Sequence, residues 1–417
     1  MDEREIEMQN VLQRFLHYVT FDTTSSGKSD TFPSTPGQGV FARYLVEEMK
    51  GMGIADARMD ENCYVYGTIP ANNGGKGPVL AFVSHLDTSP AASGRDVKPR
   101  LIENYDGGDI LLNEEKGMYM RVAQYPELAW YKGQTLIVTD GTTLLGADDK
   151  AGIAEILTMA DRLLHDDSLQ HGEIEVVFMP DEEIGRSTKK FDAGVLKADY
   201  GYTVDGGYLG KIQYENFNGA SATVTVRGVK AHTGSAKGKM INSQTVAMEF
   251  HRMLPAAQAP EYTTGYEGFF YLDNMQGTLG ETTMKYLIRE HDDAKFARMK
   301  EQLQRIAQHI NAMYGRDLVE VSIQDSYYNM RQKIEPHMHL ITSAEQAMRD
   351  VGVDPQVLPI RGCTDGVLLA FMGLPCPNLP TGGHNAHSEY EFVSVQSLEK
   401  MADALVSIAG QYAGREK

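Results

Sequence analysis

Four short apolar runs, each ending in polar residues, restrict the fold of this chain more than any other feature. They are residues 79–87 (VLAFVSHLD), 135–140 (TLIVTD), 174–180 (IEVVFMP) and 200–205 (YGYTVD). Between the second and third runs, residues 150–164 carry apolar side chains at helical spacing. Strands that are apolar on both faces are typical of a sheet covered by helices. The pattern therefore predicts an α/β fold with a mostly parallel sheet and helices on both faces.

The pattern changes near residue 215. Residues 221–228 (SATVTVRG) alternate apolar and polar side chains, as a half-exposed strand does. The elements predicted after it are a helix at 240–254, strands at 266–273 and 283–291, a helix at 295–313 and a strand at 318–326. This β-α-β-β-α-β order recurs in small α+β domains. We expect one domain made of residues 1–214 and 329–417, interrupted by a smaller α+β domain at residues 215–328.

Charge and cysteine content exclude several classes of protein. The chain has 57 acidic and 39 basic residues, a formal charge of −18, which argues against nucleic-acid and anionic-membrane partners and favours cations. Cys63, Cys363 and Cys376 are widely spaced and odd in number, so neither a disulfide framework nor a cysteine zinc site is predicted. An acidic N-terminus and the lack of an apolar run of membrane-spanning length predict a cytoplasmic protein.

Histidines and acids gather at the predicted ends of strands and in nearby loops. They are His85, Asp87, Asp148, Asp149, Asp181, Glu182, Glu183, Asp205, His384 and His387. Each has an ordinary explanation when taken alone, such as a solvated strand end, a helix cap, a tight turn or a loop histidine. Strand ends of an α/β sheet meet in one crevice, however, and a set of imidazoles and carboxylates without thiolates suits zinc or a similar divalent metal. Three carboxylate ligands and a hydroxide carry four negative charges, which two such ions would balance.

The acids Asp181, Glu182 and Glu183 follow a run that is predicted to be a buried strand. Adjacent carboxylates repel one another and resist burial. One explanation is a solvated junction between strand and loop, and the other is a bound metal ion. In the second case, one of Glu182 and Glu183 binds the metal and the other serves as a proton acceptor.

Six segments occur in the order found in a known family. They are SHLDT, LLGADDKAG, MPDEEIG, VDGG, RGVKAHTG and GGHNAHSEYEF. With them, the chain resembles the family of dizinc peptidases that includes carnosinase-type dipeptidases, glutamate carboxypeptidase and aminoacylase-type deacylases. The segments SGRDVKPRLIENYDGGDI and GQTLIVTDGTTLLGADDKAG are similar to those of its tripeptide aminopeptidases. The resemblance implies a catalytic domain interrupted by a lid domain, and two Zn²⁺ per subunit, with other divalent metals as alternatives.

The resemblance also implies a role for each candidate ligand. His85 and Asp205 would bind one zinc, Glu183 and His387 would bind the other, and Asp148 would bridge the two.

Three more acids have implied roles near these ligands. Glu182 would be the general base, and Asp87 would orient His85. Asp149 would follow Asp148 through a strained cis peptide bond.

The histidine of the glycine-rich loop is also chosen by the resemblance. His387 is preferred to His384 as the ligand, because Glu391 and Phe392 follow it at the spacing of the family motif. His384 is then an ordinary loop histidine.

Substrate contacts are implied as well. His232 would donate a hydrogen bond to the oxyanion that forms during hydrolysis. Asn242, Arg289 and Arg361 would contact the substrate, since an arginine can grip a peptide carboxylate with two hydrogen bonds. An ordinary surface or salt-bridge role is the alternative for each.

The expected activity is removal of the N-terminal residue from short peptides, chiefly tripeptides, by a water activated between two metal ions, with Glu182 as base. The lid domain also leaves open a homodimer formed through it. The alternatives are a related dipeptidase, carboxypeptidase or amide deacylase that uses two metals, and a metal-binding scaffold without turnover. No G-x-G-x-x-G follows the early strands, which argues against a nucleotide-binding dehydrogenase.

Overall fold

The computed structural model describes residues 10–415, which form two compact units. The second unit contains Glu215–Gln332 and Pro359–Cys363, and the first contains the other described residues. Pro359–Cys363 lies in the part of the sequence that the hydrophobic pattern assigned to the first domain. Since this segment has no strand or helix pattern of its own, its location could not be read from periodicity.

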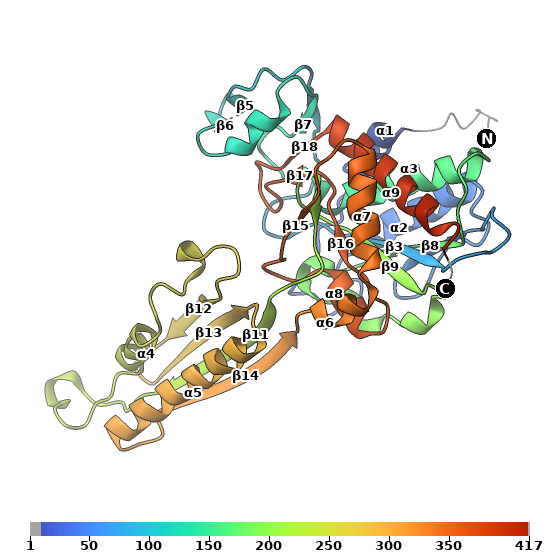
Figure 1. Ribbon diagram of the computed structural model, residues 1–417. Coiled ribbons are helices and arrows are strands. Elements are labelled where there is room, and N and C mark those ends of the chain that lie inside the picture. Colours follow the sequence, from blue (N-terminus) through green and yellow to red (C-terminus); the bar gives the residue numbers. More distant parts are fainter. Residues whose placement is uncertain (1–9, 416–417) are drawn as a thin grey trace. The chain divides into compact units, whose positions relative to one another are not determined.

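The first unit is built on a six-stranded sheet with the order β1-β2-β8-β3-β9-β16 (Figure 1). Its strands are β1 (Arg58–Met59), β2 (Val65–Ile69), β3 (Leu80–His85), β8 (Ile174–Met179), β9 (Tyr200–Val204) and β16 (Asn378–Leu379). From β8 to β16 every pairing is parallel, whereas β2 joins β8 and β1 joins β2 in antiparallel fashion. The prediction of a mostly parallel α/β sheet is confirmed.

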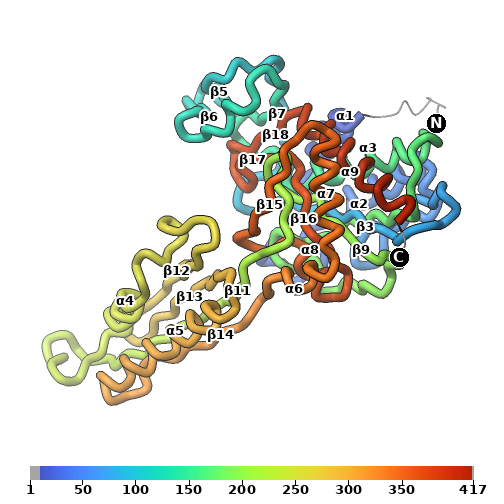
Figure 2. Tube along the Cα trace, in the orientation of Figure 1, coloured from blue at the N-terminus to red at the C-terminus, as the bar shows by residue number. Residues whose placement is uncertain are grey.

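Helices cover both faces of this sheet, as predicted. Phe82 of β3 stacks on Tyr202, whose hydroxyl lies 3.3 Å from that of Tyr412 in α9. Its neighbour Val83 points to the opposite face and joins a buried cluster with Leu369 of α8. The helices of this unit are α1 (Val11–Tyr18), α2 (Pro36–Gly51), α3 (Ala147–His165), α7 (His339–Asp350), α8 (Asp365–Phe371) and α9 (Val395–Tyr412), and α6 (Arg331–Ile334) spans the return from the second unit. Helices α1 and α9, at the two ends of the described chain, pack against each other (Figure 2).

One of the four predicted apolar strands pairs outside the central sheet. The run at residues 135–140 forms β7, which belongs to a four-stranded antiparallel sheet with the order β17-β18-β7-β4. Both of its faces are still buried: Leu136 and Val138 belong to a separate cluster with Tyr131 and Phe392, and Ile137, on the opposite face, is fully buried as well. An apolar run indicates that a strand is buried, but it does not indicate which strand it pairs with. The strands concerned are β4 (Arg100–Ile102), β7 (Leu136–Val138), β17 (Gly383–His384) and β18 (Phe392–Ser394), with the nearby hairpin β5 (Ile110–Asn113) and β6 (Met118–Met120) and the separate parallel pair β10 (Lys211–Ile212) and β15 (Gln356–Val357).

The second unit is a four-stranded antiparallel sheet with two helices on one face (Figure 1). Its elements follow the predicted β-α-β-β-α-β order: β11 (Asn218–Arg227), α4 (Ser243–Arg252), β12 (Phe269–Gly277), β13 (Glu281–Glu290), α5 (Asp293–Tyr314) and β14 (Val319–Tyr327). Val224 and Val226 are buried under the helices, whereas the intervening Thr225 faces the uncovered side. The alternation in the sequence reflects a sheet that is covered on one face only.

The cysteine side chains differ in their exposure. Cys63 and Cys376 are buried thiols, Cys363 is partly exposed, and none of the three forms a disulfide. Within residues 10–415, no helix combines the length and the apolar character that a membrane span requires.

Candidate metal centre

An acidic cluster lies at the carboxyl ends of parallel strands in the first unit. His85 is the last residue of β3, and Asp205 directly follows β9. Glu182 and Glu183 lie in a short 3₁₀ helix (Glu182–Ile184) that follows β8. Because parallel strands end at the same edge of a sheet, side chains that are far apart in the sequence meet there.

Asp148 presents one carboxylate oxygen to each of two histidines. Its Oδ1 lies 2.9 Å from Nε2 of His85, and its Oδ2 lies 3.1 Å from Nε2 of His387. Asp148 is positioned just after the start of α3, and the peptide bond to Asp149 is cis, as the family resemblance implied. The carboxylate therefore lies between the two imidazoles.

Each histidine has a further carboxylate beside it. Nε2 of His85 lies 3.9 Å from Oδ1 of Asp205, and Nε2 of His387 lies 2.9 Å from Oε1 of Glu183. The five predicted ligands thus fall into two adjacent sets that share Asp148. A second group of residues could also hold an ion, since ligand atoms of His85, Asp149 and Asp205 lie within 4.8 Å of one another.

The donor set fits two divalent cations. Two atoms bound about 2.1 Å from a tetrahedral zinc ion are about 3.4 Å apart, and the separations between imidazole nitrogens and carboxylate oxygens run from 2.9 to 3.9 Å. Nδ1 of His85 lies 3.0 Å from the main-chain oxygen of Asp87, which can only accept, so Nδ1 carries a proton. A neutral imidazole with its proton on Nδ1 would present the lone pair of Nε2 on the side of Asp148, where a cation could bind both groups.

The electrostatics of the cluster lead to the same requirement. Burial and the nearby Asp148 raise the pKa of Glu183, and burial with the same neighbour raises that of Asp205 well above its ordinary value. Hydrogen bonds to Asp148 and Glu183 raise the pKa of His387 to about 10. The cluster holds more negative charge than its two imidazoles can balance, and bound cations would supply the difference.

The three consecutive acids after β8 have three different environments. Asp181 is fully buried, and its carboxylate accepts hydrogen bonds from Ser34 and from Nε2 of Gln38. Glu183 makes the ion pair with His387. The carboxylate of Glu182 has no hydrogen-bond or ion-pair partner among residues 10–415, and burial raises its pKa well above the ordinary value. The solvated junction that could explain the triplet is therefore wrong for Asp181, which anchors the loop.

Asp87 and Asp149 accept hydrogen bonds from main-chain amides of residues in the cluster. The carboxylate of Asp87 accepts hydrogen bonds from the main-chain amides of Glu182 and Glu183, at 2.9 and 3.2 Å, and one of its oxygens lies 3.5 Å from Nδ1 of His85. Asp149 is fully buried, and its Oδ2 accepts a hydrogen bond from the main-chain amide of His85.

Two buried acids at the site were not assigned a role from the sequence. Glu391 accepts hydrogen bonds from the main-chain amides of Leu145, Gly146 and Asp148, at 2.7, 2.7 and 3.0 Å, and so holds the start of α3. Asp365 accepts a hydrogen bond from the hydroxyl of Ser187, in the segment that follows Glu183. Glu391 served only as a spacing marker in the family motif, and Asp365 was not among the candidate residues.

His384 is not a member of the ligand set. Its Nε2 is 2.6 Å from the hydroxyl of Tyr131, and its ring stacks on Phe392. Burial lowers its pKa to about 4.

The four predicted substrate contacts belong to the second unit. His232 is exposed and accepts a hydrogen bond from the amide of Gly234, and Asn242 caps α4. The guanidinium of Arg289 lies over the ring of Tyr327.

Arg361 is engaged within the second unit. It donates hydrogen bonds to the main-chain oxygen of Gly265 and to the hydroxyl of Thr263, and it lies over the rings of Phe217 and Phe269. The ordinary structural role that was the alternative for this arginine is thus present.

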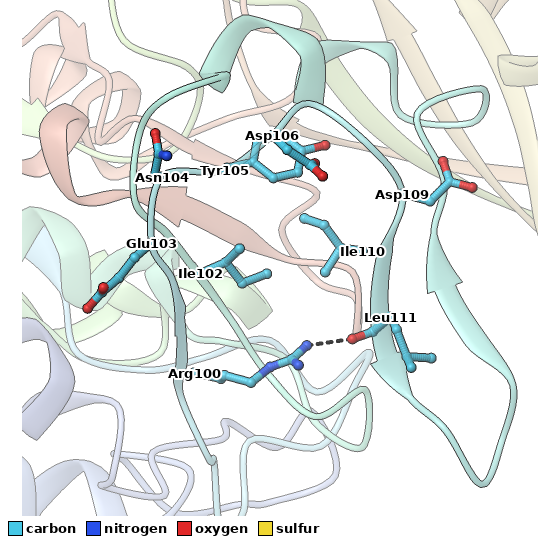
Figure 3. Close-up of a pocket in the computed structure, with 9 residues that line it drawn as sticks. All are labelled: Arg100, Ile102, Glu103, Asn104, Tyr105, Asp106, Asp109, Ile110 and Leu111. Atoms are coloured by element: carbon cyan, nitrogen blue, oxygen red, sulfur yellow. Dashed lines mark hydrogen bonds between the residues drawn. The ribbon is translucent and has the colours of Figure 1, made fainter.

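A separate hollow of about 370 Å³ lies between the segments around β4 and β5 (Figure 3). Its lining consists of Arg100, Ile102, Glu103, Asn104, Tyr105, Asp106, Asp109, Ile110 and Leu111. The guanidinium of Arg100 donates a hydrogen bond to the main-chain oxygen of Leu111, and the three acids are exposed. It contains none of the predicted ligands.

The sequence of the chain is similar to those of known peptidases. The model of peptidase family M20/M25/M40 matches residues 137–411, from β7 to α9. The peptidase T of Caldanaerobacter subterraneus subsp. tengcongensis is 51% identical over 405 residues, which are 97% of this chain and 99% of that protein.

Solved structures show the same fold. The aminopeptidase PepT from Bacillus cereus ATCC 10987 has a TM-score of 0.76 at 22% identity and covers 98% of this chain and 99% of its own. A tripeptidase from Staphylococcus aureus subsp. aureus Mu50 has a TM-score of 0.77 at 21% identity, with coverage of 99% and 100%. With the match of the family model and a relative of 51% identity over nearly the whole length, this chain belongs to peptidase family M20/M25/M40.

Proposed function

We propose that this chain is a metal-dependent aminopeptidase that removes the N-terminal residue from tripeptides. The observation that carries the proposal is the contrast between two neighbouring acids. Glu183 lies 2.9 Å from His387 in the ligand set, whereas the carboxylate of Glu182 has no partner among residues 10–415. This contrast supports Glu183 as a ligand and Glu182 as the acid that exchanges a proton. The relatives named peptidase T and tripeptidase support a short peptide as substrate.

The proposed ligands are His85 and Asp205 for one cation, Glu183 and His387 for the other, and Asp148 for both. Zinc is the metal proposed, because its preferred ligands are imidazoles and carboxylates. When bound, the cations supply the positive charge that lowers the pKa of a water nucleophile and polarises the scissile carbonyl.

The residues of the chain supply proton transfer and positioning. Glu182 is proposed to accept a proton from the water and to deliver it to the leaving amine. Asp87 holds the main-chain amides of Glu182 and Glu183, and its own main-chain oxygen accepts a hydrogen bond from Nδ1 of His85. It therefore acts as a positioning residue for both an acid and an imidazole.

Substrate binding is proposed to involve both units. The acidic centre would attract the α-ammonium group of a peptide. We assign to the second unit the role of a lid that closes on the substrate, with His232 as oxyanion donor and with Asn242, Arg289 and Arg361 as substrate contacts. The same unit is the proposed surface for a homodimer, and cysteines that form no disulfide favour a reducing cytoplasm as the location.

Product analysis with one tripeptide tests the activity. Leu-Ala-Gly is expected to release Leu and the dipeptide Ala-Gly, and N-acetyl-Leu-Ala-Gly is expected to remain intact, because the free ammonium group is required. Chelation should abolish turnover and added Zn²⁺ should restore it. Equal hydrolysis of the acetylated peptide points to a deacylase or an endopeptidase, and release of the C-terminal Gly points to a carboxypeptidase. Either result overturns the proposal.

A further inference from the structure

An aromatic cluster in the first unit has no role in the proposed proton transfer or metal binding. It comprises Trp130, Tyr131, Tyr208, His384 and Phe392. The ring of His384 stacks on Phe392 at 4.7 Å and on Tyr208 at 6.2 Å, with interplanar angles of 5° and 18°. Trp130 makes edge contacts with this stack, 5.7 Å from Tyr208 and 6.0 Å from His384, with interplanar angles of 76° and 68°.

The cluster is fixed by a packed core. Tyr131 is only 6% exposed, shares a buried cluster with Leu136 and Phe392, and contacts Nε2 of His384 through its hydroxyl at 2.6 Å. Trp130 precedes Tyr131 in the same 3₁₀ helix, Pro126–Tyr131. Its position is therefore set by the core rather than by a free loop.

The cluster adjoins the metal centre through two loops. Tyr208 lies three residues after Asp205, and His384 lies three residues before His387. Three residues span at most about 11 Å, which is also about the length of an extended tripeptide. The Cα atoms of Tyr208 and His384 therefore lie no farther than about this length from those of the proposed ligands Asp205 and His387.

The two loops are also bonded to each other. The amide of Gly382 donates a hydrogen bond of 2.8 Å to the main-chain oxygen of Gly207, and the amide of Asp205 donates one of 2.9 Å to that of Leu379. The aromatic surface and the ligands thus belong to one connected framework.

Trp130 leaves a large apolar surface open beside this framework. Its side chain is 62% exposed, although tryptophan is highly buried on average. Among residues 10–415, no Arg or Lys side chain lies over its ring, whereas such cations lie over several other aromatic rings, such as Arg58 over Tyr66. A rigid aromatic ring at the edge of a binding site offers apolar contact area at a low cost in conformational entropy.

We propose that Trp130 and Tyr208 form a subsite that takes an apolar side chain of the peptide substrate. The inference rests on the proposed peptidase activity and adds a preference for leucine-like residues to it. A side chain is the occupant that suits the surface, because the exposed area is that of a single ring and is continuous with the loops that carry the ligands.

Kinetics on a matched peptide set test the subsite. Leu-Gly-Gly, Gly-Leu-Gly and Gly-Gly-Leu are each compared with Gly-Gly-Gly, and a parallel set carries Lys in place of Leu. At one position, leucine should raise kcat/KM about tenfold over glycine, as expected when an apolar side chain leaves water for an apolar surface. Trp130→Ala should remove most of this gain, and Trp130→Phe should keep most of it.

The ratio of kcat/KM for two peptides does not depend on the fraction of folded enzyme, so a general loss of stability cannot imitate the result. Tyr119→Ala is the matched control, because Tyr119 is another exposed aromatic residue of the first unit, 37% exposed in β6, and the variant should keep the full leucine gain. A leucine gain that survives in Trp130→Ala, or a larger gain for lysine than for leucine, overturns the proposal.

Fluorescence gives a readout that does not need turnover. Trp130 is the only tryptophan of the chain, so all indole emission comes from this surface. In the Glu182→Gln protein, the leucine peptide should shift or quench the emission in a saturable way, and Gly-Gly-Gly at the same concentration should change it less. An emission that does not respond to the leucine peptide overturns the subsite. If the wild-type enzyme cleaves none of the peptides but the emission responds, the proposed peptidase activity is wrong and the subsite stands.

Discussion

The main-chain amide of Glu182 donates a hydrogen bond to the carboxylate of Asp87 over 2.9 Å, across 95 positions of sequence. The other oxygen of the same carboxylate accepts from the amide of Glu183 at 3.2 Å. Asp87 is also the residue whose main-chain oxygen lies 3.0 Å from Nδ1 of His85. This one residue therefore ties the loop after β8 to the end of β3.

Asp87→Asn is expected to lower zinc affinity about 10- to 100-fold, the usual effect of losing a residue that orients ligands. An amide group has one acceptor oxygen where the carboxylate has two, so it cannot accept both main-chain hydrogen bonds equally well. Zinc titration against a competing chelator measures the change. Asp56→Asn is the control, because Asp56 also accepts two hydrogen bonds, from Thr68, but on the exposed edge of the unit. Unchanged zinc affinity in Asp87→Asn would remove its positioning role.

Glu183→Gln is expected to lose metal. The carboxylate is proposed as a ligand, and a neutral amide binds zinc far more weakly. Metal analysis of the purified variant should show lowered occupancy together with lost activity. Full occupancy would show that Glu183 is not a ligand.

Glu182→Gln is expected to keep both metals and to lose activity. The substitution removes the proton acceptor but preserves the size of the side chain, so the rate should fall at least the roughly 100- to 10,000-fold ascribed to general base catalysis. Metal content and hydrolysis rate, measured on the same preparation, separate this variant from Glu183→Gln. If Glu182→Gln is the one that sheds metal, the two assignments are reversed.

His232→Ala is expected to reduce the turnover rate on the order of 100-fold or more, with unchanged metal content, because it removes a proposed oxyanion donor. The measurement is kcat with a tripeptide at saturation. His309→Ala serves as the matched control, since His309 is an exposed histidine on α5 of the same unit and should be neutral. A near-normal kcat in His232→Ala would leave this residue with its local role of accepting the Gly234 amide.

His384→Gln is expected to flatten the dependence of stability on pH. Burial lowers the pKa of His384 to about 4, below the roughly 6.5 of an unfolded chain. The folded state therefore prefers the neutral ring, and the stabilisation is complete above about pH 6.5 and is lost as the pH falls toward 4.

For a single such histidine, the loss between pH 7.5 and pH 5 is about 2 kcal/mol. Urea unfolding of both proteins at the two pH values tests the difference, because the proposed metal ligands titrate alike in both. Equal pH dependence in wild type and His384→Gln would show that this ring does not titrate as its burial implies.

The sequence by itself determined the two kinds of sheet and the residue types that meet at the metal centre. Hydrophobic periodicity depends only on neighbouring residues. The apolar run that contains Phe82 and Val83 indicates a strand buried on both faces, and the alternation around Val224 indicates a strand buried on one face. The candidate ligands stand at strand ends and in motifs with a fixed order, so His85, Asp205 and their companions could be named before any contact was known. The choice of Glu183 over Glu182 as the proposed ligand came from the family resemblance, because the hydrophobic pattern of the sequence does not distinguish two adjacent acids.

Only the tertiary structure decided which residues touch. Three features depend on contacts that the local sequence does not reveal. They are the pairing of β7 with β4 and β18, the hydrogen bonds from three main-chain amides to Glu391, and the stacking of His384 on Phe392. The same holds for Trp130, whose sequence neighbours give no sign that its ring lies beside Tyr208. Local preferences set the burial and the element type of a residue, but its partners are set by the order and register of the strands, which are global properties of the folded chain.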